Sequence, residues 1–93
     1  MKNKFTPYQI QINPGAIVQM KPAGKKWSNP EIQKAVGGYY QIINLGDAVM
    51  FVDEDGKQKG YSKNTLATTL AEKFISAGDF IVGNVLVSPL NLV

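Results

Sequence analysis

The chain has 93 residues, of which 44% are hydrophobic and 18% are charged. This length suffices for one domain but not for two, and the composition supplies enough apolar side chains for a core. The chain contains no cysteine and no histidine. Disulfides, thiolate catalysis, Cys/His zinc sites and imidazole acid–base catalysis are therefore excluded.

The positive charges are all lysines, and ten of them against seven acidic residues give a net charge of +3. Arginine is the side chain that most often grips phosphate or guanine with two parallel hydrogen bonds. Its absence argues against a sequence-specific DNA-binding protein, although a lysine still binds phosphate as a point charge. No apolar run approaches the roughly 20 residues of a membrane span, so we expect no membrane contact, no targeting segment and a cytoplasmic location.

The first part of the chain predicts a hairpin. Residues 1–7 are polar and predict a flexible lead-in or an edge strand. In residues 8–12 apolar side chains alternate with glutamines, which indicates a strand with one solvent-exposed face. An Asn-Pro-Gly sequence at 13–15 predicts a turn, and residues 16–20 would form the partner strand.

Residues 21–28 form a loop rich in lysine, proline and glycine, and the only tryptophan lies near its end. Two interpretations of Trp27 are open. In the first, its ring packs as a hydrophobic staple just before the following helix. In the second, it is a flat stacking surface beside Lys25 and Lys26. The first is favoured because amphipathic tryptophans are common where helices begin.

A short helix is predicted after this loop. Ser28 and Glu31 have the spacing of a capping box, and Asn29 followed by Pro30 is an alternative start. Three apolar residues at i, i+3 and i+4 predict the buried stripe, namely Ile32, Ala35 and Val36. The glycine pair Gly37 and Gly38 would end the helix and form a hinge.

The rest of the chain predicts a sheet and a second helix. Strands are expected at 39–45, 48–53 and 57–61, and the second of them is apolar enough to be central and buried on both faces. A helix over 65–76 would bury Leu66, Leu70 and Phe74, with Ala67, Ala71 and Ile75 widening the buried stripe. A last strand would cover residues 80–87. Residues 1–93 would then form a single α+β domain, an antiparallel meander sheet of about four to six strands with two short helices packed on one face.

The acidic cluster at residues 53–55 lies in a predicted turn that solvent should reach. It matches only the opening of a calcium-binding loop, because the closing glutamate of that pattern is missing. A nucleophile, a base and an orienting group cannot be assembled from the spacing of the remaining polar residues. We therefore expect no metal, no cofactor and no enzymatic activity.

Four short segments stand out in order: Ile-Gln-x-x-Val-Gly-Gly-Tyr at 32–39, Asp-Glu-Asp-Gly-Lys at 53–57, Asn-x-x-Ala-Thr at 64–68 and Asp-x-Ile-Val-Gly-x-Val-x-Val at 79–87. Together they resemble a family catalogued as domain of unknown function 3846, found mainly in phages, prophages and mobile elements of bacteria. Asp53 stands where the family usually has asparagine. The resemblance implies a family-like core at 31–87 and a viral or mobile-element protein in the bacterial host cytoplasm.

In that setting we expect a small non-enzymatic phage-type binding protein, a host-defence antagonist that sequesters a nucleotide-derived signalling molecule. A small phosphate-bearing nucleotide ligand needs backbone N–H groups, lysines and aromatic faces. The candidate ligand-binding residues are Lys25, Lys26, Trp27, Gly37, Gly38, Tyr39, Tyr40, Asn64 and Thr68. The protein would be a homo-oligomer with the pocket at its subunit interface.

A structural role is also open for these candidates. The paired glycines fit a helix end, one tyrosine can lie in the core, and the asparagine and threonine fit a helix cap and a helix-surface hydroxyl. The alternative function is an accessory module that binds nucleic acid or a host protein.

Overall fold

The computed structural model describes residues 6–12 and 15–93. Its elements in chain order are β1 (Tyr8–Ile10), β2 (Ile17–Gln19), α1 (Asn29–Val36), β3 (Tyr40–Asn44), β4 (Ala48–Asp53), α2 (Thr65–Ala71), the 3-10 helix η1 (Glu72–Phe74), β5 (Val85–Pro89) and the 3-10 helix η2 (Leu90–Leu92). The expected α+β class is confirmed. The predicted lead-in and the turn at 13–15 fall largely on positions 1–5 and 13–14, which lie outside the described residues.

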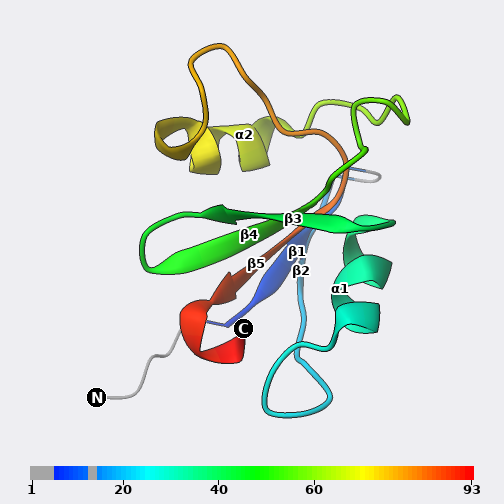
Figure 1. The fold of residues 1–93 in the computed structure, drawn as a ribbon, viewed down its shortest axis with the longest axis vertical. Helices are drawn as coiled ribbons and strands as arrows, with labels where there is room; N and C mark the ends of the chain where they lie inside the picture. Colours follow the sequence, from blue (N-terminus) through cyan, green and yellow to red (C-terminus); the bar gives the residue numbers. More distant parts are fainter. Residues whose placement is uncertain (1–5, 13–14) are drawn as a thin grey trace.

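The five strands form one antiparallel sheet in the order β2-β1-β5-β4-β3 (Figure 1). β3 and β4 form the predicted hairpin, and β5 inserts between β4 and β1. The prediction of a strand over residues 57–61 was wrong. That segment closes into consecutive turns, with hydrogen bonds from Lys59 N–H to Asp55 O (2.9 Å) and from Tyr61 N–H to Gly56 O (3.1 Å).

The two helices lie on opposite sides of the sheet (Figure 1), where the sequence had placed both on one face. Side chains alternate across a strand, so β4 presents Val49 and Phe51 to the α1 side and Met50 and Val52 to the α2 side. All six β4 residues are buried. An apolar strand of this kind leaves two faces to cover, and one helix on each face covers them.

Helix α1 has the predicted boundaries and caps. The Ser28 hydroxyl accepts from Glu31 N–H, the Glu31 carboxylate accepts from Ser28 N–H, and Gly37 ends the helix at φ 99°. Trp27 and Ile32 belong to the same buried cluster. They occupy the positions of a hydrophobic staple, so the packing interpretation of Trp27 agrees with the structure.

Helix α2 is rotated about its axis relative to the prediction, so that it buries the alanines expected only to widen the buried stripe. Ala67 and Ala71 are fully buried, whereas Leu66, Leu70 and Phe74 keep 43%, 39% and 48% of their surface exposed. The prediction that these three form the buried stripe was therefore wrong. Ala67 and Ala71 belong to the buried cluster on this side of the sheet, and the hydrogen bonds described below position the helix.

The C-terminal residues dock on the core of their own chain. Trp27 N–H donates to Leu92 O (2.8 Å), and Leu92 packs against the cluster on the α1 side. Among the described residues, no helix has the length and apolar character that crossing a membrane requires.

Candidate functional site

A cavity of ≈ 630 Å³ opens on the α2 side of the sheet. Its walls are β3, the end of β4, residues 54–58 and residues 74–82. Small-molecule sites commonly enclose about 300–1,000 Å³. The cavity is therefore large enough for a ligand of nucleotide size.

The lining combines aromatic, amide and charged side chains. Phe74 and Phe80 contribute rings, and Gln41 and Gln58 contribute amides. The Phe80 ring is 39% exposed. Lysine ammonium groups lie near it, with Nζ of Lys57 at 4.5 Å and Nζ of Lys63 at 5.9 Å from the ring centroid. An accessible ring beside two cations can stack on a flat ligand that carries negative charge.

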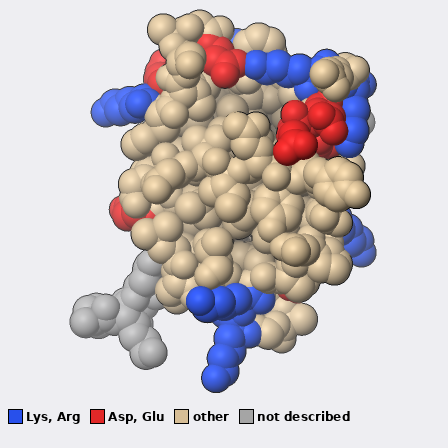
Figure 2. All heavy atoms as spheres, in the orientation of Figure 1, with Lys and Arg blue, Asp and Glu red and all other residues tan. Residues whose placement is uncertain are grey.

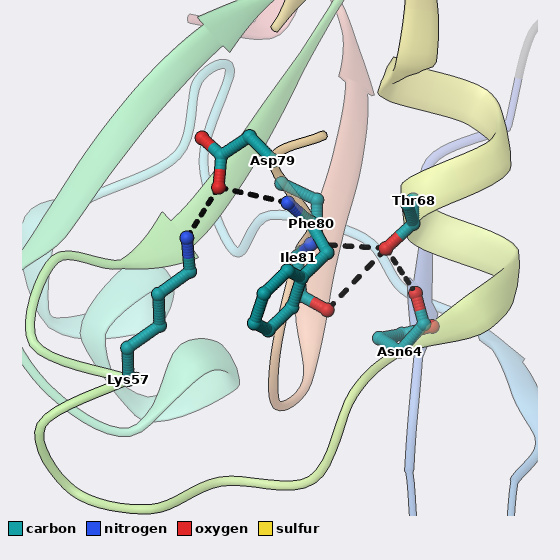
Figure 3. Close-up of polar contacts among 6 residues, drawn as sticks. All are labelled: Lys57, Asn64, Thr68, Asp79, Phe80 and Ile81. Carbon is teal, nitrogen blue, oxygen red and sulfur yellow. Dashed lines mark hydrogen bonds and ion pairs between the residues drawn. The ribbon is translucent and has the colours of Figure 1, made fainter. Parts of the chain in front are cut away.

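Asp79 fixes the backbone beside this ring (Figure 3). Its carboxylate accepts a hydrogen bond from Lys57 Nζ and one from Phe80 N–H, the latter at 2.8 Å. The hydrogen bond from Lys57 and then the one from Phe80 N–H lower the pKa of Asp79 below its ordinary value. The carboxylate is therefore ionised at neutral pH and holds Lys57 and Phe80 together.

Thr68 and Asn64 tie the same segment to helix α2 (Figure 3). Ile81 N–H donates to Thr68 Oγ1 (2.9 Å), and the Thr68 hydroxyl donates to Asn64 O (2.9 Å). Asn64 is the N-cap of α2, and its Nδ2 donates to Gly83 O (2.8 Å). Thr68 bonds the backbone of the cavity wall and Asn64 bonds the residue just after it, so both position the wall without lining the cavity.

The remaining predicted ligand residues do not meet at one place. Lys25 and Lys26 are exposed before α1, while Gly37 and Gly38 follow its far end. The eight residues of α1 separate the two pairs by about 12 Å at 1.5 Å per residue. Trp27 is buried, and its indole N–H donates to Ser88 Oγ (2.9 Å).

The two tyrosines divide as the structural interpretation predicts. Tyr39 is 72% exposed. Tyr40 is half-buried, donates its hydroxyl to Asn29 Oδ1 (2.6 Å) and packs edge-on against Phe51 at a centroid distance of 5.3 Å. Only Tyr39 therefore offers an open ring, and it is absent from the lining of the cavity.

A second polar cluster, which the sequence did not reveal, lies at the end of α1. The expectation that solvent reaches Asp53 was wrong, because its side chain is fully buried. It accepts from Lys59 Nζ (2.7 Å) and from Asp55 N–H (2.8 Å). The alternation of β4 was the available signal, since Asp53 follows Val49 and Phe51 on the α1 side.

Burial alone would raise the pKa of Asp53, but the hydrogen bonds from Lys59, Asp55 N–H and Tyr61 outweigh it and lower that pKa. The hydrogen bond to Asp53 raises the pKa of Lys59 in turn. Lys59 Nζ also donates to Gly37 O (3.2 Å). The pair is charged at neutral pH and fastens the turn segment to the end of α1.

Tyr61 explains why glycines surround this cluster. A Cβ added to Gly37 would lie 2.8 Å from the Tyr61 hydroxyl oxygen, and one added to Gly83 would lie 2.5 Å from the Tyr61 ring. Gly56 also faces the ring, at 3.2 Å. These glycines leave room for a tyrosine. A role for Gly37 in holding phosphate is not needed to account for it.

The neighbouring hollow is small. It measures ≈ 260 Å³ and is lined by residues that include Lys34, Tyr61 and Asn84. This volume lies below the usual range for small-molecule sites. In the described part of the chain, no group of three or more His, Cys, Asp or Glu residues is placed to hold a metal ion.

A family model described as domain of unknown function (DUF3846) matches residues 3–91, so the chain belongs to this family. No curated protein and no solved structure matches it. In the structure, hydrogen bonds connect the four segments of the resemblance, in one case through Lys59. Lys57 bonds Asp79, Asn64 bonds Gly83, and Lys59, which is bound to Asp53, bonds Gly37.

Proposed function

We propose that this member of the DUF3846 family is a non-enzymatic binding protein that sequesters a small nucleotide-derived molecule in the ≈ 630 Å³ cavity. One observation carries the proposal. The cavity wall holds an accessible ring, Phe80, which lies near two lysine ammonium groups. Asp79 fixes the backbone N–H of Phe80, and Thr68 fixes that of the next residue, Ile81.

Each part of such a ligand has a matching group in the lining. A base stacks on Phe80, at about 1–3 kcal/mol per base. The amides of Gln41 and Gln58 both donate and accept hydrogen bonds, which suits the edge of a base. Phosphate would be met by Lys57 of the lining and by Lys63, which lies near the Phe80 ring but outside the lining. The proposed ligand class is thus the one expected from the sequence. The proposed binding residues differ from those expected from the sequence.

The biological setting of the proposal comes from the family resemblance. A phage-type protein that binds such a signal without altering it would antagonise a host defence that depends on the signal. The alternative, an accessory module for nucleic acid or a host protein, predicts binding of single strands that weakens steeply as salt rises.

Isothermal titration calorimetry and thermal shift against mononucleotides, cyclic oligonucleotides and ADP-ribose derivatives test the proposal. At least one ligand is expected to bind at micromolar concentration, with Phe80→Ala weakening it about tenfold or more. Tyr39→Ala is the matched control, because Tyr39 is an exposed aromatic residue outside the cavity. Mass spectrometry of the released ligand should show it intact.

The proposal fails if no ligand of the panel binds, or if Phe80→Ala and Tyr39→Ala have the same effect. Recovery of a cleaved or modified ligand would contradict the non-enzymatic part. A salt-dependent signal with single-stranded nucleic acid alone would favour the accessory module.

A further inference from the structure

Strand β3 is an edge of the sheet and lacks the usual protection of edge strands. Edges are commonly blunted by charged residues, proline, a bulge or very short length. The five residues of β3 are Tyr-Gln-Ile-Ile-Asn, and they pair with β4 in continuous register. Where β3 runs across the side of the molecule that faces the reader, the surface is largely free of charged side chains, which gather toward the rim (Figure 2).

The opposite edge differs in one decisive respect. β2 has only three residues, from Ile17 to Gln19. It is also exposed, with Ile17 at 59%. A strand of that length offers few hydrogen-bonding groups to a neighbour, so shortness alone protects it.

The backbone of β3 has groups that point away from the sheet. Leu45 N–H donates to Ala48 O (2.8 Å), and Glu54 N–H donates to Tyr39 O (2.9 Å). Residues 39 and 45 therefore bond inward, toward β4. Since the bonding direction alternates along an antiparallel strand, Tyr40, Ile42 and Asn44 direct their N–H and C=O groups to the open edge.

We propose that a second copy of this chain covers that edge, with the two β3 strands antiparallel about a two-fold axis at Ile42. Ile42 then pairs with Ile42 of the partner subunit, and Tyr40 pairs with Asn44 of the partner subunit. Each such pair exchanges two backbone hydrogen bonds. The two sheets become one continuous sheet through an isologous interface.

Charge and exposure favour a second copy as the occupant. The two-fold axis places the side chain at position 42 beside its own equivalent, where a charged side chain would repel itself. β3 has no charge, and Ile42 is 49% exposed and gains an apolar neighbour.

The interface would also complete the cavity. Residues of β3 from Gln41 to Asn44 form one of its walls. The partner's β3 would lie directly beside that wall. The inference stands on the strand edge and does not depend on the proposed ligand.

Light scattering after size-exclusion chromatography measures the mass of the full chain in solution. We expect twice the chain mass of 10.2 kDa. Ile42→Lys places like charges on the axis and should give the single-chain mass. Ile17→Lys is the matched control on the other edge and should keep the double mass. Both side chains are exposed, and circular dichroism verifies that both variants fold.

Amide hydrogen exchange gives a second readout. The N–H groups of Tyr40, Ile42 and Asn44 should exchange at least about tenfold faster in Ile42→Lys than in the wild type. A wild-type chain that has the single mass up to about 100 µM overturns the inference, and so does a dimer that Ile17→Lys breaks and Ile42→Lys does not. A single-mass chain that binds its ligand would overturn this inference and leave the proposed function intact.

Discussion

The two faces of the sheet are closed in different ways. On the α1 side, large side chains interdigitate, and Trp27, Phe51 and Leu86 belong to one buried cluster. On the α2 side, the helix contributes only Ala67 and Ala71 to the buried cluster. Its two leucines, Leu66 and Leu70, stay about half exposed, and its position is set by hydrogen bonds to the segment that follows it.

Two helices of similar length are therefore held against one sheet by different forces. Packing of large side chains contributes most of the stabilisation of α1 against the sheet, because burial of an aromatic ring is worth several kcal/mol. Hydrogen bonds to the backbone hold α2, and each contributes about 1 kcal/mol. Substitutions on the two sides should therefore lower the free energy of unfolding by different amounts, and four substitutions test this.

Trp27→Ala should have the largest effect. It removes the ring at the start of α1 and leaves Ser88 without its indole donor. We expect the free energy of unfolding to fall by about 4 kcal/mol. Urea denaturation followed by circular dichroism measures it. Trp27→Phe keeps most of the packing and should cost clearly less, and equal losses would show that packing is not the main force.

Gly83→Ala should have the second largest effect, because the added methyl group would clash with the Tyr61 ring. Gly83 has φ 76°, and a Cβ there would lie 2.5 Å from the Tyr61 ring. Left-handed strain and overpacking together should cost about 3 kcal/mol. Gly78→Ala is the control, since Gly78 has φ 82° with no atom within 4 Å. It should cost about 1 kcal/mol, and two equal losses in thermal or urea unfolding would argue against the steric role.

Asp53→Asn should cost about 2 kcal/mol, because it removes a charged partner from Lys59 and weakens a buried hydrogen-bond set. The lowered pKa of Asp53 also has a pH signature. Its stabilising contribution is present above the unfolded-state pKa of about 3.9 and is lost as pH falls through the folded-state value. Urea titrations from neutral pH into this acid range should show a shallower decline for the variant, and identical slopes would contradict this prediction.

Leu70→Ala should have the smallest effect, within about 0.5–1 kcal/mol, because the side chain is half exposed and alanine favours the helix. The same urea assay measures it. A loss of 2–5 kcal/mol, typical of a buried leucine, would show that α2 packs through its leucines after all.

The sequence predicted α1 well because every signal for it is local. Ser28 and Glu31 mark its start, Gly37 marks its end, and its single apolar stripe leaves one face to bury. The strands β3 and β4 were predicted for the same reason, since two residues connect their predicted ends. Local patterns determine elements whose boundaries and partners lie close along the chain.

The orientation of α2 could not be predicted in this way. Its alanines and its leucines form adjacent stripes, and the hydrophobic period does not say which stripe meets the sheet. The choice is made by Asn64 and Thr68, which bond backbone at positions 81 and 83. Those contacts join segments that are distant in sequence, so no window of residues contains the information.

The candidate site was only partly predictable for a related reason. Phe80 and the lysines near it are separated by up to 23 residues along the chain, and the turns between 54 and 60 bring them together. The sequence correctly predicted that Gly37 ends α1. The contact between Tyr61 and Gly37 was not predicted, because Tyr61 reaches Gly37 only after the same turns form.

The place of β5 in the sheet has a consequence for how the molecule is made. β5 is the last strand in chain order, yet it joins β1 to β4 in the middle of the sheet. Residues 8–10 pair with residues 85–87, which closes a loop of nearly the whole chain. Such distant pairing slows folding. Before β5 leaves the ribosome, the β1–β2 and β3–β4 hairpins have no strand between them. Their apolar faces therefore stay exposed until β5 is made.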